Sequence, residues 1–194
     1  MSTMVMLVGP TGCGKSTFRQ KHLAGLPCVS PDDFIVGQWT AKKAAHAWQC
    51  ARNMAIELLI EKQSFVVDAQ FLDPAVRAEW MSLAIGFGYK THVFVFDTTW
   101  TQLRKNQQSR GARGHYGLIP HKVQRRSYQL MKQQLAALKA DHDGGMRVME
   151  NGVFLHINAI GIAGVGLDIA IVTVVKWSEQ VRKLWAPIVK GILS

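Results

Sequence analysis

The sequence predicts an α/β protein with a mostly parallel sheet flanked by helices, followed by an apolar and amphipathic C-terminal extension. Two observations predict the sheet: short apolar runs alternate with segments of helical periodicity, and the first run leads into a glycine-rich turn. A third observation predicts the extension: the apolar run at residues 157–175 does not belong to this alternation of short apolar runs and helical segments. We therefore expect one domain over 1–145 and a separate segment over 146–194, divided at the polar turn Asp141–Gly145.

The elements follow in chain order from apolar spacing and capping residues. Runs such as Met4–Val8 and SFVVD are short, rich in apolar residues and bounded by turns, which is typical of buried strands. Asp73 before Pro74 is a helix-start pattern. We expect strands at Met4–Val8, Pro27–Ser30, Ser64–Asp68 and Thr91–Asp97. We expect helices at Lys15–Ala24, Ala41–Glu61, Asp73–Phe87, Thr101–Arg110 and Pro120–Ala140.

The composition excludes several classes of protein and indicates an anionic partner. Of 194 residues, 48% are apolar and 19% are charged, so the chain is neither disordered nor of low complexity. Three cysteines have neither the number nor the spacing of a disulfide framework or a zinc site. The formal net charge is +10, which favours binding to phosphate-bearing molecules.

The turn after the first strand carries the strongest motif. The residues GPTGCGKST, from Gly9 to Thr17, fit the phosphate-loop pattern G-x-x-x-x-G-K-[ST] between a strand and a helix. In such a loop backbone N–H groups face the phosphates, Lys15 reaches the β/γ oxygens, and the Ser16 hydroxyl is placed to hold Mg²⁺. The predicted nucleotide contacts are Gly9, Thr11, Gly12, Cys13, Gly14, Lys15, Ser16 and Thr17.

Carboxylates follow the second and third predicted strands. Asp32 and Asp33 lie where a carboxylate can accept the proton of an attacking hydroxyl, although one of them could instead cap the next helix. Asp68 ends its strand, as a Mg²⁺-linked or acceptor-binding carboxylate would, or as an ordinary turn residue would. Both sites fall at the sheet edge where α/β proteins bind ligands.

A one-sided block of positive charge lies between Asp97 and Asp141, where there is no acidic residue. It suggests a surface that faces phosphate, while the alternative is a basic face that only aids solubility. Four of its residues flank glycines at 111, 114 and 117, as in a mobile lid over the γ-phosphate. These four are Arg104, Lys105, Arg110 and Arg113.

Five segments in order resemble phage-type polynucleotide 5′-hydroxyl kinases over about residues 4–138. They are GPTGCGKST, SPDDF, VVDAQFLDP, FVFDTTWTQLRKNQQSRG and IPHKVQRRSYQLMKQQL. The resemblance implies a P-loop kinase fold that uses ATP and Mg²⁺, with Lys15 and Ser16 in the phosphate loop. It also implies that Asp32 is the general base, that Arg110 stabilises the transferring phosphoryl group, and that Asp68 helps to hold the acceptor nucleotide.

Two departures from that family affect acceptor binding. Ile35 stands where the family has an arginine that contacts the acceptor's phosphate. Asn106 stands at a second lid arginine, with Lys105 and Arg104 beside it as substitutes. The predicted function is transfer of the γ-phosphoryl group of ATP to the 5′-hydroxyl of DNA or RNA. The alternatives are a kinase of a modified base in DNA, a nucleoside or another small hydroxyl compound, and an ATP-regulated binding module.

The C-terminal extension leaves three interpretations open. Residues 147–157 suggest a hairpin around Asn151-Gly152, and residues 176–194 suggest a basic amphipathic helix. The extension could pack on the kinase domain, form a homo-oligomer or contact a membrane. Asp168 inside the apolar run and the basic tail after it disfavour a membrane span. We expect a cytoplasmic protein, in the host cytoplasm if a phage encodes it, with packing or self-association of the tail.

Overall fold

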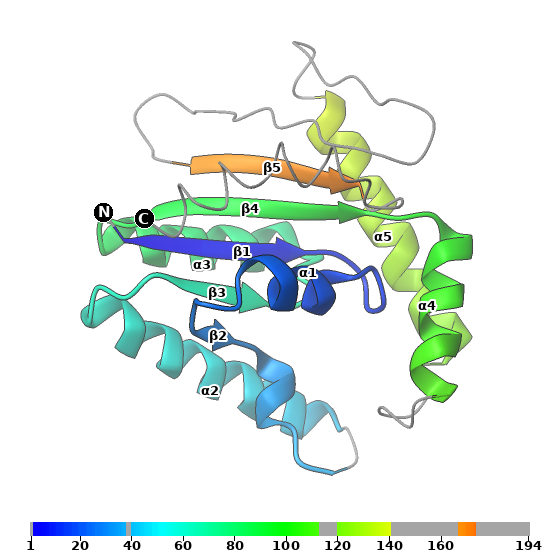
Figure 1. Ribbon diagram of the computed structural model, residues 1–194, viewed down its shortest axis with the longest axis horizontal. Helices are drawn as coiled ribbons and strands as arrows, with labels where there is room; N and C mark the ends of the chain where they lie inside the picture. Colours follow the sequence, from blue (N-terminus) through cyan, green and yellow to red (C-terminus); the bar gives the residue numbers. More distant parts are fainter. Residues whose placement is uncertain (1, 38–39, 113–119, 141–166, 174–194) are drawn as a thin grey trace.

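The computed structural model describes residues 2–37, 40–112, 120–140 and 167–173. Their strands form one five-stranded sheet in the order β2-β3-β1-β4-β5 (Figure 1). The strands are β1 (Thr3–Val8), β2 (Cys28–Val29), β3 (Phe65–Asp68), β4 (Lys90–Asp97) and β5 (Leu167–Thr173). Every pairing is parallel, so the carboxyl ends of all five strands lie at one edge of the sheet.

Strand β1 lies at the centre of the sheet. Leu7 is in register with Asp68 of β3 on one side and with Phe94 of β4 on the other. All six residues of β1 are buried, which explains its continuous apolar sequence TMVMLV. The segment that follows β1 therefore begins at the centre of the sheet's carboxyl edge, directly after a fully buried strand.

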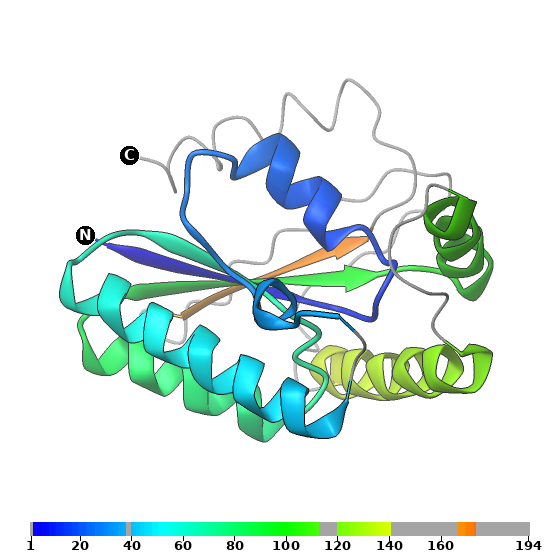
Figure 2. The same ribbon diagram turned by 90° about the horizontal axis from the view of Figure 1, so that it is seen from below.

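Helices cover both faces of the sheet. They are α1 (Lys15–His22), α2 (Ala41–Ile60), α3 (Pro74–Gly86), α4 (Trp100–Ala112) and α5 (His121–Ala140), with a 3-10 turn η1 at Pro31–Phe34. Figure 2 shows α1 on one face, α2, α3 and α5 on the other, and α4 beyond the carboxyl edge of the strands. The carboxyl edge is thus framed by α1, α4 and α5.

Aromatic side chains form much of the core on each face. On the α1 face, the Phe18 ring lies 5.3 Å from the Phe94 ring and 5.4 Å from the Phe96 ring. On the other face, Phe71 and Trp80 meet edge to face at 5.7 Å. The strand residues alternate between these two clusters, as a sheet covered on both faces requires.

The predicted α/β fold with its parallel sheet and flanking helices is confirmed. Asp73 caps α3 as expected, accepting a hydrogen bond from the Ala75 N–H at 2.8 Å. Among the strands that the structure describes, β5 was not predicted: seven residues of the apolar run pair with β4, Ile169 in register with Val93 and Ile171 with Val95. The predicted hairpin, the predicted helix at 176–194 and the boundary at residue 145 lie outside the described residues.

None of the helices in the described ranges is long and apolar enough to cross a membrane. The part of the apolar run that the structure describes is a sheet strand. For these seven residues, the extension therefore packs against the sheet of the first domain.

Candidate phosphoryl-transfer site

The phosphate loop connects the end of β1 to the start of α1. Gly12 and Gly14 adopt φ values of 89° and 106°, a region that residues with a Cβ rarely occupy. Gly9 is required for a different reason, since a Cβ there would lie 2.7 Å from Cys13 Sγ and 3.0 Å from Phe96 Cβ. Gly14 is the N-cap of α1, and no side chain in the described part caps this helix. The first turn of α1 therefore keeps N–H groups and a positive helix end for an anion.

Lys15 is buried at the base of the loop. Its ammonium donates to the Gly9 carbonyl at 2.9 Å and to the Pro10 carbonyl at 3.3 Å. Because its side chain is only 8% exposed, its positive charge is concentrated where the loop would receive phosphate oxygens. This placement is consistent with the predicted contact of Lys15 with the β/γ oxygens of the nucleotide. That contact remains a prediction.

Ser16 and Asp68 meet beside the loop. The Ser16 hydroxyl donates to Asp68 Oδ2 at 3.0 Å, and Arg19 Nε lies 3.7 Å from the same oxygen. Asp68 is 8% exposed, so its carboxylate sits in a buried position with one hydroxyl and one cation as neighbours. The structure thus brings together two of the predicted site residues that lie 52 positions apart in the chain.

The Ser16 hydroxyl and the Asp68 carboxylate are suited to hold Mg²⁺ together with nucleotide phosphates, and they are not suited to hold a metal ion by themselves. Within the described residues, no group of three or more His, Cys, Asp or Glu side chains gathers to hold a metal ion. Mg²⁺ prefers oxygen ligands and is commonly held by one or two protein groups together with nucleotide phosphates and water. Ser16 and Asp68 supply a hydroxyl and a carboxylate for that arrangement.

The predicted base lies at the same carboxyl edge. Asp32 and Asp33 are exposed residues of η1, which begins two residues after β2. Val29 of β2 is in register with Val67 of β3, so η1 follows β2 at the level where Asp68 ends β3. Ile35 is half-buried directly after this turn. The turn therefore places two carboxylates at the same sheet edge as the loop, and an apolar side chain stands at position 35, where the phage-type kinases have an arginine.

The predicted lid residues are only partly described. Arg104 donates to Gln124 Oε1 at 3.3 Å and lies over the Trp100 ring, which ties α4 to α5. Lys105 is exposed on α4. Arg110 belongs to α4, but its side chain is outside the described part, as is the whole of Arg113. Asn106, which stands where the phage-type kinases have a second lid arginine, donates to the Gly12 carbonyl at 2.8 Å and so contacts the phosphate loop directly.

Residues 4–138 match a family of AAA domains, AAA_33, and cover the loop, both carboxylate positions and α4. The chain belongs to this AAA domain family. The match ends inside α5, before the segment that contains β5.

Solved structures share the fold of this AAA domain chain at low sequence identity. A putative kinase from Chloroflexus aurantiacus is 16% identical with a TM-score of 0.60, over 99% of this chain and 97% of that one. A gluconokinase from Sinorhizobium meliloti is 15% identical with a TM-score of 0.53, over 98% and 95%. A chain of the Pnkp1/Rnl/Hen1 RNA repair complex is 16% identical with a TM-score of 0.62, over 80% and 52%. This chain thus spans about half of the RNA repair chain, and the likenesses establish a kinase-like P-loop fold.

The cysteines of the AAA domain behave as packing residues. Burial raises the pKa of the Cys13 thiol, which packs against Gly9 inside the loop. Burial, followed by the nearby Asp68 and Asp33 carboxylates, raises the pKa of Cys28 to about 11 despite Arg19. Both thiols therefore remain protonated near neutral pH.

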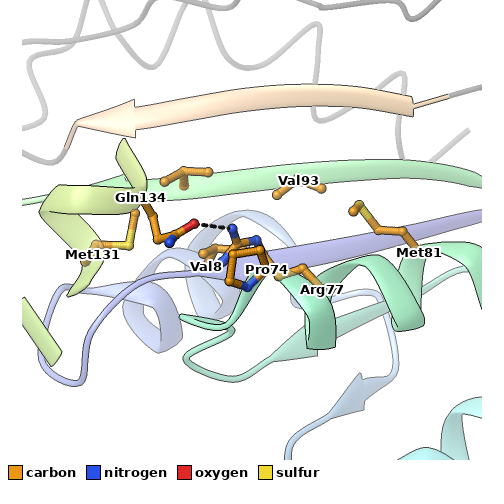
Figure 3. Close-up of a pocket in the computed structure, with 8 residues that line it drawn as sticks. Val8, Pro74, Arg77, Met81, Val93, Met131 and Gln134 are labelled. Atoms are coloured by element: carbon orange, nitrogen blue, oxygen red, sulfur yellow. Dashed lines mark hydrogen bonds between the residues drawn. The ribbon is translucent and has the colours of Figure 1, made fainter. Parts of the chain in front are cut away.

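A separate pocket lies on the opposite face of the sheet, between α3 and α5 (Figure 3). Its volume is about 190 Å³, and its Arg77 guanidinium is already engaged by Gln134 Oε1 at 3.0 Å and the Phe71 carbonyl at 2.5 Å. Most of its walls are apolar: Val8, Pro74, Arg77, Met81, Val93, Val95, Met131 and Gln134. It offers few ligands for a phosphate and does not include the loop.

Sequence reasoning missed three residues that touch the site. Arg19 pairs with Asp68, and Gln107 and Gln124 pack against the loop at Gly12. Gln107 follows Leu103 by four positions on the buried side of α4, so a glutamine at an apolar helix position was the available signal. Arg19 carried no signal, because a basic residue near the end of a short helix is ordinary.

Proposed function

We propose that this chain is a kinase that transfers the γ-phosphoryl group of ATP to a hydroxyl group. The observation that carries the proposal is the contact of Ser16 with Asp68 beside the phosphate loop, at the same sheet edge as the exposed Asp32. A protein that only binds nucleotide needs a loop and a metal-linked carboxylate, but it needs no carboxylate on the acceptor side. Asp32 therefore favours a transferase over an ATP-regulated binding module.

In the proposed reaction, the acceptor hydroxyl loses its proton to Asp32 as its oxygen bonds to the γ-phosphorus of ATP. The bond between that phosphorus and the β,γ-bridging oxygen breaks, and ADP leaves. Lys15 and the α1 N-terminus stabilise charge on the phosphates, and Arg110 is assigned the same task from the lid. Mg²⁺, when bound through Ser16 and Asp68, would neutralise further charge on the β- and γ-oxygens.

For the acceptor, we propose the 5′-hydroxyl end of DNA or RNA, as in the phage-type enzymes. Exposed basic side chains on α4 and α5 support this choice because they offer positive charge to the phosphates of a nucleic acid. They include Lys105, Lys122, Arg125 and Arg126. The likeness in fold to a chain of an RNA repair complex agrees with it.

A small hydroxyl compound, a nucleoside or a modified base is the second candidate acceptor. Ile35 favours it, because an apolar side chain at this position cannot pair with an acceptor phosphate. The near-complete overlap with a putative kinase and a gluconokinase also favours it, whereas only about half of the RNA repair chain is matched.

Label transfer from γ-labelled ATP tests both candidates. The acceptors are oligonucleotides with a 5′-hydroxyl, the same oligonucleotides with a 5′-phosphate, base-modified DNA, nucleosides and small polyols. Label on the 5′-hydroxyl strands only supports the first candidate, and label on small acceptors only supports the second. A wild-type protein that binds ATP yet labels no acceptor in the presence of Mg²⁺ would argue against a kinase of these acceptor classes.

A further inference from the structure

Three amide side chains meet the phosphate loop where it passes α4 and α5. Asn106 Nδ2 donates to the Gly12 carbonyl at 2.8 Å, and Gln102 donates to Asn106 Oδ1 at 2.7 Å, which fixes the direction of the Asn106 amide. A Cβ on Gly12 would lie 3.5 Å from Gln107 Oε1 and 3.9 Å from Gln124 Nε2. The same glycine is thus approached by side chains from two different helices.

Two of these amide side chains should lower the stability of the fold. Gln107 is 4% exposed and Gln124 is 2% exposed, yet Gln107 Oε1 and Gln124 Nε2 have no hydrogen-bond partner within the described residues. A buried polar atom without a partner destabilises a fold, and an apolar residue of similar size would avoid that cost. Packing alone therefore gives no reason for a glutamine at position 107, and at position 124 only the Oε1 atom has a partner, Arg104 at 3.3 Å.

The peptide group that they face belongs to the phosphate-binding turn. Its carbonyl, from Gly12, is held by Asn106, and its N–H, from Cys13, donates to the Pro10 carbonyl at 3.2 Å. Gly12 has a positive φ, a backbone conformation that residues with a Cβ rarely adopt. Asn106 restrains this turn through its hydrogen bond, while Gln107 Oε1 and Gln124 Nε2 lie near the same turn as an acceptor and a donor without hydrogen-bond partners in the described residues.

We propose that Asn106 is a positioning residue that holds the phosphate loop at Gly12 in the shape that binds nucleotide phosphates, and that Gln107 and Gln124 offer their unpaired amide atoms to the same turn when phosphate is bound. This inference rests on one part of the proposed function, the binding of a nucleotide by the phosphate loop. The three residues do not touch the reacting atoms. Through Asn106 the loop is held to α4.

The test uses Gln107→Met, which keeps the side-chain size and removes the unpaired oxygen. The matched control is Gln108→Met, at the next and exposed position of the same helix. Equilibrium binding is measured for ATP, ADP and inorganic tripolyphosphate, together with the thermal unfolding temperature. We expect Gln107→Met to unfold at the same or a higher temperature while binding all three ligands about five- to tenfold more weakly. The control should match the wild type in both measurements.

Asn106→Leu, at a half-buried position, repeats the test if Gln107→Met fails to fold. Unchanged affinity in the folded variants would overturn the inference. Weaker binding of ATP with normal binding of tripolyphosphate would also overturn it, because the amides would then contact the base and not shape the loop. Since the readout is binding, an absence of phosphoryl transfer would refute the proposed function and leave this inference standing.

Discussion

The two halves of the candidate site differ in how firmly the fold holds them. On the phosphate side, Lys15 at the start of α1 and Asp68 at the end of β3 are buried, and they are hydrogen-bonded to the phosphate loop and to Ser16 respectively. On the acceptor side, Asp32 and Asp33 are exposed on a four-residue turn after a two-residue strand. The phosphate side is thus built into the core, while the acceptor side depends on short surface segments that can change without loss of the fold.

Lys15→Ala should have the largest effect, because it removes the charge at the centre of the phosphate side. We expect phosphoryl transfer to fall by about 10³-fold or more, by analogy with the loss of a single charge-stabilising group in other enzymes. Steady-state rates and ATP affinity measure the effect. Lys42→Ala, on the exposed start of α2, is the control and should leave both unchanged. A Lys15→Ala protein with normal ATP affinity and a normal transfer rate would show that Lys15 does not act on the phosphates.

Asp68→Asn should weaken metal binding without removing the hydrogen bond from Ser16. An amide oxygen can still accept from that hydroxyl, but the negative charge beside the bound cation and Arg19 is lost. We expect the Mg²⁺ concentration for half-maximal activity to rise about 10- to 100-fold, with partial recovery at high Mg²⁺. Titration of Mg²⁺ at saturating ATP measures this. An unchanged Mg²⁺ requirement would remove Asp68 from the metal site and leave it as an acceptor contact.

Ile35→Arg tests the acceptor side, where we expect a smaller effect. An arginine at this half-exposed position should bind the phosphate of an oligonucleotide acceptor and lower its KM by about three- to tenfold. The kcat and the KM for ATP should not change. Ile35→Leu is the control, as it preserves the apolar side chain. If Ile35→Arg abolishes activity toward small acceptors and does not improve oligonucleotide binding, the acceptor is a small molecule.

Thiol modification should have the smallest effect on activity. Because burial raises the pKa of Cys28 to about 11 and also raises that of Cys13, little thiolate forms at pH 8. We expect iodoacetamide at pH 8 to modify the half-buried Cys50 first and to leave transfer unchanged. Modification of Cys28 should increase only as the pH rises toward 11, as followed by peptide mass spectrometry. Rapid inactivation at pH 7 through Cys13 would show that the loop thiol is not buried.

The difference between the two halves also explains what the sequence could predict. The phosphate loop was found from residues 9–17 alone, because its backbone geometry requires glycines and the binding of phosphate and Mg²⁺ calls for its lysine and serine. The strands and helices around it were predicted within a few residues, since apolar spacing and the Asp73 cap set them locally. Asp68 was identified because a carboxylate ends a buried strand, and the structure places it against Ser16.

Contacts between distant segments could not be predicted in the same way. Arg19 meets Asp68, and Asn106 meets Gly12, only because parallel strands and α4 converge on one edge. The strand β5 was missed because its seven residues lie inside a longer apolar run, and its partner β4 is some 70 residues earlier in the chain. The hydrogen bond of Asn106 to Gly12 could not be predicted from the sequence. The asparagine at this position shows that the family's second lid arginine is absent, but it does not show what the asparagine contacts instead.

The most direct test of the proposed reaction is Asp32→Asn, measured beside Asp33→Asn. An asparagine keeps the shape of the turn but cannot take the acceptor proton. We expect Asp32→Asn to bind ATP with wild-type affinity and to transfer label about 10²- to 10⁴-fold more slowly, while Asp33→Asn stays near the wild-type rate. Wild-type transfer by the Asp32→Asn protein would contradict the assignment of Asp32. A selective loss in Asp33→Asn would instead assign the base to its neighbour.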